Sequence, residues 1–585
     1  MGKVNISKPP TLTSLFCQVE DTVSLDQQIK KFWELEAVPE VFCLAPDDAK
    51  VENMFMNTYT REHSGRFVVD LPFKEENPVF PNIRSLALSR FYSLERRLQK
   101  SPELYDQYRT FMKEFVELGH MEPVTIICTI LINFRLHGYV ITADISKVYR
   151  QILINPTQTD YQGVLWRSNN SEPVRINRVV YGLSCSPYLA IRCLHQLAND
   201  DGDSFPLAAE ALKTGTYVDD IVSSCPSFEN ALALRDELIA LLAKGGFELK
   251  KWSSNVPDLL KGLAVSDLAI KPLTFNDDIS SKTLKVLGLE WDASSDTFAF
   301  KVQVLDSSCT KRHLLSNLAK IFDPLGFLSP ITFLIKHLIQ RIWTQKIGWD
   351  DAPSKEIIRL WKKYIDDVAY LSKLNLPRRL LIDDILRLEV HCFGDASEKG
   401  YCAVLYFRCL SPSGQPFVSF VTAKSKVAPI NKGLTIPRLE LSAAVLVARL
   451  VSFVSSVIKD KVEIKDIYCY SDSAVTLRWL QSSPNQWKTF ESNRVAYVQD
   501  SAVTLRWLQS SPHHWKTFVS NRVAYVQERV ASSCWHYVPS EENPADIGSR
   551  GCLPSELINC SKWWEGPTFS HSDPLTFFEL NSNEY

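Results

Sequence analysis

Two adjacent carboxylates lie between apolar runs of the sequence. Asp219 and Asp220 follow Thr216-Tyr217-Val218 and precede Ile221-Val222, a pattern that predicts a strand–turn–strand hairpin. Adjacent aspartates repel one another unless a cation shares them. On these residues alone, a solvated turn is the better explanation, because Asp is common in turns.

A third carboxylate makes metal chemistry the stronger hypothesis. Asp144 ends the apolar stretch Val140-Ile141-Thr142-Ala143. If this strand and the hairpin are neighbours in one sheet, the three acids would hold two Mg²⁺ about 3.5–4 Å apart, the arrangement used for in-line phosphoryl transfer. Carboxylates and water are the ligands that Mg²⁺ prefers.

A glycine-containing turn and a helix start lie between these acids. Gly182, after Tyr181, permits close backbone approach, and Ser186 and Pro187 are predicted to cap and open a helix. The order of strand-Asp, Gly-Leu-x-x-Ser-Pro and Tyr-Val-Asp-Asp resembles the palm of a reverse transcriptase. Further phrases are similar to the BEL/Pao group of long-terminal-repeat retrotransposons: 65–73, 247–255, 286–291, 322–331 and 563–567.

This resemblance implies an RNA-directed DNA polymerase that uses an RNA template, a DNA primer and deoxynucleoside triphosphates. Its Mg²⁺, or alternatively Mn²⁺, would be held by the three acids already named. Tyr149 matches the aromatic gate that excludes a ribose 2′-OH, although an ordinary core aromatic is an equal alternative. Tyr181 and Gly182 would contact substrate, and Lys250 or Lys251 would act near the leaving pyrophosphate.

A second set of acids occurs downstream. Asp395 ends the apolar stretch Val390–Phe393 and Gly394, and Glu440 lies one turn into a helix opened by Pro437. Asp472 follows a predicted strand, and Asp546 lies at the predicted start of a helix. Each acid alone is more often a strand end or a helix cap. In this order they resemble ribonuclease H, which implies two Mg²⁺ and hydrolysis of RNA in an RNA/DNA hybrid.

An internal repeat falls within this second set. Asp472–Gln499 recurs as Asp500–Gln527, an offset of 28 residues. Two near-identical copies indicate a tandem duplication, because a solenoid needs about three or more repeats. Asp472 is favoured over Asp500 as the site residue, since a plausible strand, Asp466–Ser471, precedes it. The extra residues are then expected to form a surface insertion.

Composition limits the remaining alternatives. The chain has 585 residues, 45% of them hydrophobic, with a net charge of −2, so a globular multidomain protein is expected, with nucleic-acid binding by local basic strips. Its 14 cysteines show no Cys-x-x-Cys spacing, which argues against zinc knuckles and a disulfide scaffold. Neither Asp-Thr-Gly nor Asp-Ser-Gly occurs, so no aspartic peptidase site is visible.

No membrane partner is expected. The cytoplasm is the expected location, with element-encoded particles or the nucleus as alternatives.

The expected fold class is α+β: a palm and fingers-like domain, a helical connection, and an α/β ribonuclease H-like domain. The predicted divisions are a lead-in at 1–69, the palm at 70–300, the connection at 301–385, the nuclease-like domain at 386–552 and a tail at 553–585. Compared with the group that the chain resembles, part of the fingers segment is missing near Val124 and Thr125. An alternative is therefore a decayed or domesticated nucleic-acid-binding protein without polymerase activity.

Overall fold

The computed structural model describes residues 46–73, 124–164, 174–175, 177–183, 185–269, 283–300, 308–430, 434–482 and 513–571. Four of the predictions above lie outside these residues: the lead-in up to residue 45, the region just before the expected fingers truncation, Asp500, and the tail beyond residue 571.

The first acid-bearing sheet has the strand order β7-β8-β3-β9, with antiparallel neighbours throughout. Its strands are β3 (Tyr139–Ile145), β7 (Thr216–Tyr217), β8 (Asp220–Cys225) and β9 (Leu249–Ser254). The central strand β3 is buried at nearly every position, as expected for a strand with neighbours on both sides. The predicted hairpin around Val218 is confirmed, since β7 and β8 pair directly across it.

Helices α7 (Ser186–Asp200), α8 (Pro206–Thr214) and α9 (Phe228–Lys244) cover this sheet and share its hydrophobic core. Ser227 caps α9 as its position predicts, because its hydroxyl accepts a hydrogen bond from the backbone N–H of Asn230. The predicted cap at Ser186 is wrong. Ser186 is already the first helical residue, and its hydroxyl donates to the Val180 carbonyl at 2.5 Å.

Further elements complete this half of the chain. They are α2 (Pro46–Thr58), β1 (Thr60–Arg61), β2 (Phe67–Val69), α5 (Val124–Leu136), α6 (Val148–Gln151), β4 (Leu153–Ile154), β5 (Gly163–Val164) and β6 (Val174–Arg175). A second antiparallel sheet follows, made of β10 (Thr283–Val286), β11 (Leu289–Asp292), β12 (Thr297–Ala299) and β13 (Asn375–Pro377). Strand β13 comes from the segment expected to be a helical connection, so that segment is not wholly helical.

The connecting segment consists mainly of α10 (Lys311–Ala319), α11 (Ser329–Thr344) and α12 (Lys355–Asp367). Nearby, Arg135 at the end of α5 is only 2% exposed. Its guanidinium donates to the carbonyls of Arg378, Phe420 and Val421 at 2.7–2.9 Å. Burial, with the nearby Arg378, lowers the pKa of Arg135 to about 9. One buried side chain thus connects α5 to backbone that is far away in sequence.

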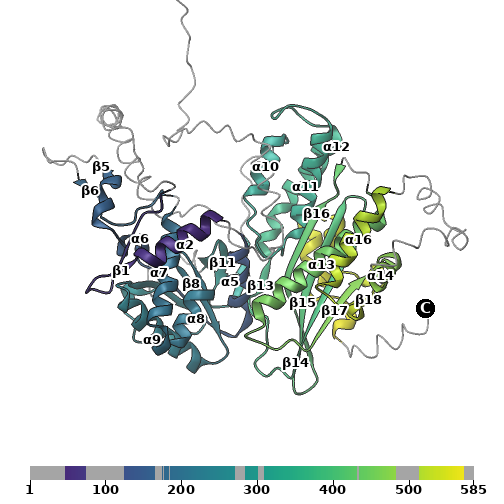
Figure 1. Cartoon of the computed structure of the whole chain (residues 1–585). Helices are drawn as coiled ribbons and strands as arrows, with labels where there is room; N and C mark the ends of the chain where they lie inside the picture. The colour runs from purple at the N-terminus through teal and green to yellow at the C-terminus, as the bar shows by residue number, and fades with distance from the viewer. Residues whose placement is uncertain are drawn as a thin grey trace, which may run out of the picture. The chain divides into compact units, whose positions relative to one another are not determined.

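The second acid-bearing sheet has the order β16-β15-β14-β17-β18 (Figure 1). Strands β14 (Arg387–Ala396), β15 (Gly400–Leu410) and β16 (Pro416–Val427) are antiparallel. Strands β17 (Asp466–Ser471) and β18 (Trp535–Tyr537) then continue from β14 in parallel. Strand β17 pairs in parallel with β14, so the chain must cross over from the edge strand β16 to reach it. Helix α13 (Ile436–Ile458) lies in this crossover. The later helices are α14 (Ala474–Gln481), α16 (His513–Gln527), α17 (Ala545–Arg550), α18 (Pro554–Ile558) and α19 (Ser561–Glu565).

Helix α13 is long and apolar enough to cross a membrane by length and composition. In the structure it packs against β14 and β15, and more than half of its residues are buried, including Leu441 and Val447. An apolar helix with this environment is the core helix of an α/β layer.

Within the described residues, each copy of the duplicated segment contributes one helix to this fold. Helix α14 comes from the first copy and α16 from the second, and both contact α13. Gln527 at the end of α16 donates to the carbonyls of Leu480 and Ser482 at 2.7 and 2.9 Å. Because the described helices take the early part of one copy and the late part of the other, together they represent a single repeat unit.

Candidate active sites

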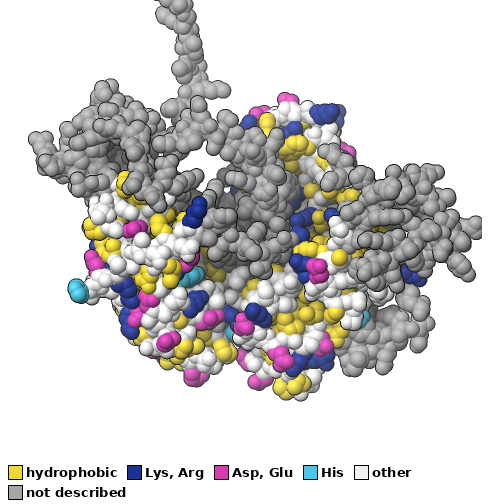
Figure 2. Space-filling model, viewed as in Figure 1, with side chains coloured by type: hydrophobic (Ala, Val, Ile, Leu, Met, Phe, Trp, Pro, Cys, Tyr) yellow, Lys and Arg dark blue, Asp and Glu magenta, His cyan; other side chains and the backbone are white. Residues whose placement is uncertain are grey.

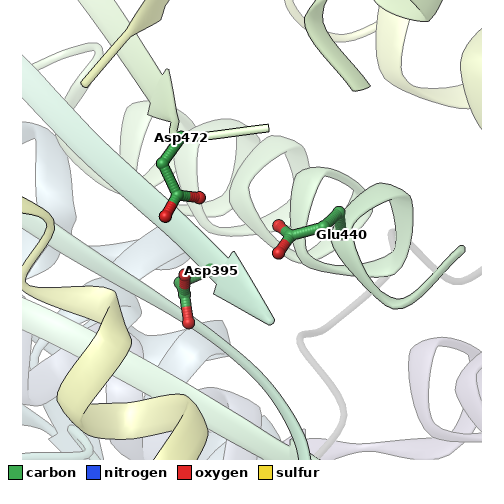
Figure 3. A group of neighbouring side chains, drawn as sticks. All are labelled: Asp395, Glu440 and Asp472. Carbon is green, nitrogen blue, oxygen red and sulfur yellow. The ribbon is translucent and has the colours of Figure 1, made fainter. Parts of the chain in front are cut away.

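Three of the four downstream acids converge at one edge of the second sheet. Asp395 is near the end of β14, and Asp472 directly follows β17. Since β14 and β17 are parallel neighbours, their carboxyl ends meet at the same edge. Glu440 reaches this edge from the first turns of α13, and Figure 3 shows the three carboxylates pointing toward one another. Each offers an oxygen within 4.8 Å of the others.

Serine hydroxyls donate to two of these carboxylates, whereas Glu440 accepts a hydrogen bond from the Ala396 backbone and keeps one oxygen without a donor. The Ser549 hydroxyl donates to Asp395 Oδ2 at 2.5 Å, and the Ser540 hydroxyl donates to Asp472 Oδ2 at 2.6 Å. Glu440 is 7% exposed, and its Oε2 has no hydrogen-bond partner among the described residues. A buried carboxylate oxygen without a donor is costly, so this oxygen is suited to a ligand.

Burial and crowding shift the proton affinity of two of these acids. Burial, followed by the charge of Asp472, raises the pKa of Asp395 to about 7. Burial, followed by the charges of Asp395 and Asp472, raises the pKa of Glu440 to about 9. The group therefore holds protons near neutral pH, and a cation that binds here must displace them.

The fourth predicted acid, Asp546, lies close by but outside this triad. Its side chain forms an ion pair with Arg550 Nε at 2.6 Å, one turn along α17. Its charge still contributes to the raised pKa of Asp395 and of Glu440. Asp546 is therefore near enough to act on the triad electrostatically while its own oxygen is held by Arg550.

The upstream acids are brought together by strand pairing. Asp144 on β3 is directly opposite Asp220 on β8, and residues opposite one another on antiparallel strands share a face. Asp219 occupies the turn after Val218, whose φ is +56°, and its carbonyl accepts a hydrogen bond from the Ile145 N–H at 2.7 Å. The left-handed Val218 is uncommon for a β-branched residue, so the turn is held in an unfavourable conformation.

These acids also perturb one another. Burial, followed by the charge of Asp144, raises the pKa of Asp219 to about 6. Burial, followed by the charges of Asp219 and Asp144, raises the pKa of Asp220 to about 7. Lys251 Nζ lies 3.0 Å from Asp144 Oδ2. Among the described residues, the carboxylates of Asp395, Glu440 and Asp472 bring oxygens within 4.8 Å of one another, whereas the upstream acids are less tightly gathered.

The other predicted substrate residues have different environments. Tyr149 is 3% exposed, and its ring packs edge-on against that of Tyr181 at 4.6 Å. This burial agrees with the core-aromatic alternative, and a role at the substrate stays a prediction. Gly182 has φ +92°, with open space where a Cβ would be. Lys250 Nζ pairs with Glu248 and Asp267 at 2.7 and 2.9 Å, rather than with the acids.

Sequence reasoning missed the side chains that orient the downstream acids. Ser549 and Arg550 are three and four residues after Asp546, the spacing that brings side chains onto one helix face. That spacing is a signal that could have identified both residues. Ser540 carries no comparable signal, because only the fold brings it to Asp472.

Both acid groups fit a hard divalent cation. All of their donors are oxygens, which suits Mg²⁺ or Mn²⁺. In the downstream triad, the unpartnered Glu440 Oε2 and the raised pKa values indicate that ionised carboxylates are disfavoured unless a cation offsets their charge. In the upstream group the raised pKa values of Asp219 and Asp220 indicate the same crowding.

Residues 310–473 match the family model described as Pao retrotransposon-like RNaseH-like domain. This segment contains Asp395, Glu440 and Asp472, so the predicted Pao-type resemblance is confirmed there. Together with the two acid-bearing sheets, it also confirms the predicted fold class. The family match spans both the predicted connection and much of the predicted nuclease-like domain. No curated protein matches the chain.

Two solved structures of a foamy viral protease-reverse transcriptase are similar to this chain. The one in complex with RNA/DNA hybrid has 16% identity and a TM-score of 0.42, covering 71% of this chain and 45% of its own. The one in complex with double-stranded DNA has 17% identity and a TM-score of 0.43, covering 72% and 60%. This chain thus corresponds to less than half of the first structure's length.

Proposed function

We propose that the chain hydrolyses the RNA strand of an RNA/DNA hybrid at the site formed by Asp395, Glu440 and Asp472. The observation that carries this proposal is the convergence of these three carboxylates within 4.8 Å of one another, from two parallel strand ends and a helix. The match of residues 310–473 to an RNase H-like family supports the choice of substrate.

The residues have distinct parts in this proposal. Asp395, Glu440 and Asp472 would hold Mg²⁺ or Mn²⁺, which when bound supplies water activation and stabilisation of the leaving oxygen. Ser549 and Ser540 keep two of the carboxylates in place through their hydroxyls. Asp546 would join the triad as a metal ligand once its contact with Arg550 opens. The proton on Glu440 must leave before its carboxylate can bind a cation.

A hybrid-cleavage assay tests this proposal. The purified chain is mixed with a labelled RNA/DNA hybrid and Mg²⁺, and Asp395→Asn is compared with wild type and with Glu398→Gln, an exposed neighbour on the next turn. Asp395→Asn should lower the cleavage rate by about a hundredfold or more, because it removes a carboxylate that would hold the cation needed to stabilise the transition state. Glu398→Gln should not change the cleavage rate. Cleavage by the Asp395→Asn variant at the wild-type rate would refute the proposal.

We propose RNA-directed DNA synthesis as a second function, at the site formed by Asp144, Asp219 and Asp220. The specific observation in its favour is the direct cross-strand pairing of Asp144 with Asp220 beside the turn that carries Asp219. RNA template, DNA primer and deoxynucleoside triphosphates would be its substrates.

Primer extension on an RNA template, with Asp220→Asn as the inactive control, tests this second function. Extension by wild type and none by the variant would support it. Hybrid cleavage without any extension would instead favour a nuclease on a polymerase-like domain that has lost synthesis, and neither activity would favour the alternative of a nucleic-acid-binding remnant.

A further inference from the structure

Two consecutive lysines of β9 lie beside the upstream acids, yet they make different contacts. Lys251 Nζ lies 3.0 Å from Asp144 Oδ2. Lys250 Nζ is held by Glu248 and Asp267 instead. In a regular strand, consecutive side chains point to opposite faces of the sheet. Lys250 is opposite Asp144 in the strand pairing, so the contact of Lys251 with the same aspartate needs an explanation.

A β-bulge provides it. Thr142 on β3 is opposite Ser253 on β9, whereas Asp144 is opposite Lys250. Two residues of β9 therefore stand opposite one residue of β3, which is the arrangement of a β-bulge. Lys251 is one of these two residues, and its φ of +52° is in the left-handed region.

The burial pattern of β9 is consistent with this displacement. Leu249 and Trp252 are both buried although they are three residues apart, and the two lysines between them are more exposed. Bulges re-aim side chains, often beside active sites. A left-handed conformation costs a lysine about 1 kcal/mol or more, so the contact between Lys251 and Asp144 is made at the expense of backbone strain.

We propose that Lys251 is a built-in counter-ion of the upstream acid group, occupying one edge of the site from which a divalent cation must displace it. This inference rests on the proposed role of Asp144, Asp219 and Asp220 as a cation site. It assigns the lysine function to Lys251 alone, although the sequence left Lys250 and Lys251 equivalent.

The full-length chain allows a test with a matched control, since Lys250→Gln changes the same residue type one position away. Mn²⁺ binding is measured by electron paramagnetic resonance, with Asp395→Asn and Asp472→Asn present throughout so that the downstream triad does not contribute. Lys251→Gln should tighten Mn²⁺ binding by about three- to tenfold, because a largely exposed ammonium is partly screened. Lys250→Gln should leave it unchanged.

Amine labelling gives a second readout that needs no lysine substitution. Acetylation of Lys251, followed by peptide mass spectrometry, should rise several-fold when Mn²⁺ is added and also when Asp144 is changed to Asn, whereas acetylation of Lys250 should not. The proposal would be overturned if the two lysine variants had equal effects on Mn²⁺ binding. It would also be overturned if acetylation of Lys251 changed neither on addition of Mn²⁺ nor in Asp144→Asn. In the Asp395→Asn, Asp472→Asn background, absence of Mn²⁺ binding both with and without Lys251→Gln would also overturn it, together with the upstream cation site. That result would not bear on the hybrid cleavage proposed for the wild-type downstream triad.

Discussion

Changing Glu440 to Gln should stabilise the metal-free protein while it abolishes hybrid cleavage. Glu440 is 7% exposed, and its pKa is raised from 4.5 to about 9 by burial and by the charges of Asp395 and Asp472. The folded protein therefore binds this proton more tightly than the unfolded chain does. The free energy of unfolding must then fall as the pH rises from about 4.5 toward 9.

The size of the effect follows from the same values. Each pKa unit corresponds to about 1.4 kcal/mol, so an interval of about 2.5 units between pH 4.5 and pH 7 costs roughly 3 kcal/mol. The amide of Gln must also be desolvated, which reduces the expected gain to roughly 2 kcal/mol. For a domain of 150–250 residues this gain raises Tm by about 4–8 °C.

Differential scanning calorimetry of the full chain in EDTA measures this directly. Glu440→Gln should melt at a higher temperature than wild type near pH 8, and the difference should shrink toward pH 5. Glu398→Gln serves as the control because its side chain is exposed. Mg²⁺ should raise the Tm of wild type more than that of Glu440→Gln. If the Glu440→Gln protein is no more stable than wild type near pH 8, then folding does not raise the pKa of Glu440 as described above.

Three further predictions follow from other parts of the structure. Because Mg²⁺ must displace the proton on Glu440, its apparent affinity should rise by about tenfold per pH unit between pH 7 and 9, and a calorimetric titration that gives a pH-independent affinity would contradict this. Deleting residues 485–512 joins Pro484 to His513 and restores one repeat unit, so hybrid cleavage should persist and the free energy of unfolding should change by about 1 kcal/mol or less. Loss of cleavage in a folded deletion protein would contradict the assignment of α14 and α16. Arg135→Met should lower stability by roughly 3 kcal/mol, since three buried carbonyls lose their donor, and an unchanged Tm would show that this guanidinium is dispensable.

The positions of the acids could be predicted from sequence because the relevant signals are local. Asp144, Asp395 and Asp472 each end or follow an apolar strand, and Glu440 is one turn inside a helix opened by proline. Strand ends and helix starts are readable from a few residues, and the order of the elements then selects the sheet edge at which they meet.

Details that depend on register or on distant contacts could not be predicted in this way. The bulge that separates Lys251 from Lys250 depends on how β9 pairs with β3. The hydroxyl of Ser186 donates to the Val180 carbonyl because the preceding turn brings that oxygen close, so its cap signal was misleading. Asp546 is withdrawn from the triad by Arg550, a competition that its position at a helix start does not indicate.

The central claim is that Asp395, Glu440 and Asp472 together bind divalent metal. Crystals of the full chain soaked in Mn²⁺ and measured for anomalous scattering would test it most directly. We expect an anomalous peak bounded by the carboxylates of these three residues, and its loss in Asp395→Asn crystals. A Mn²⁺-soaked crystal with clear side-chain density for the triad and no peak between the carboxylates would contradict the claim.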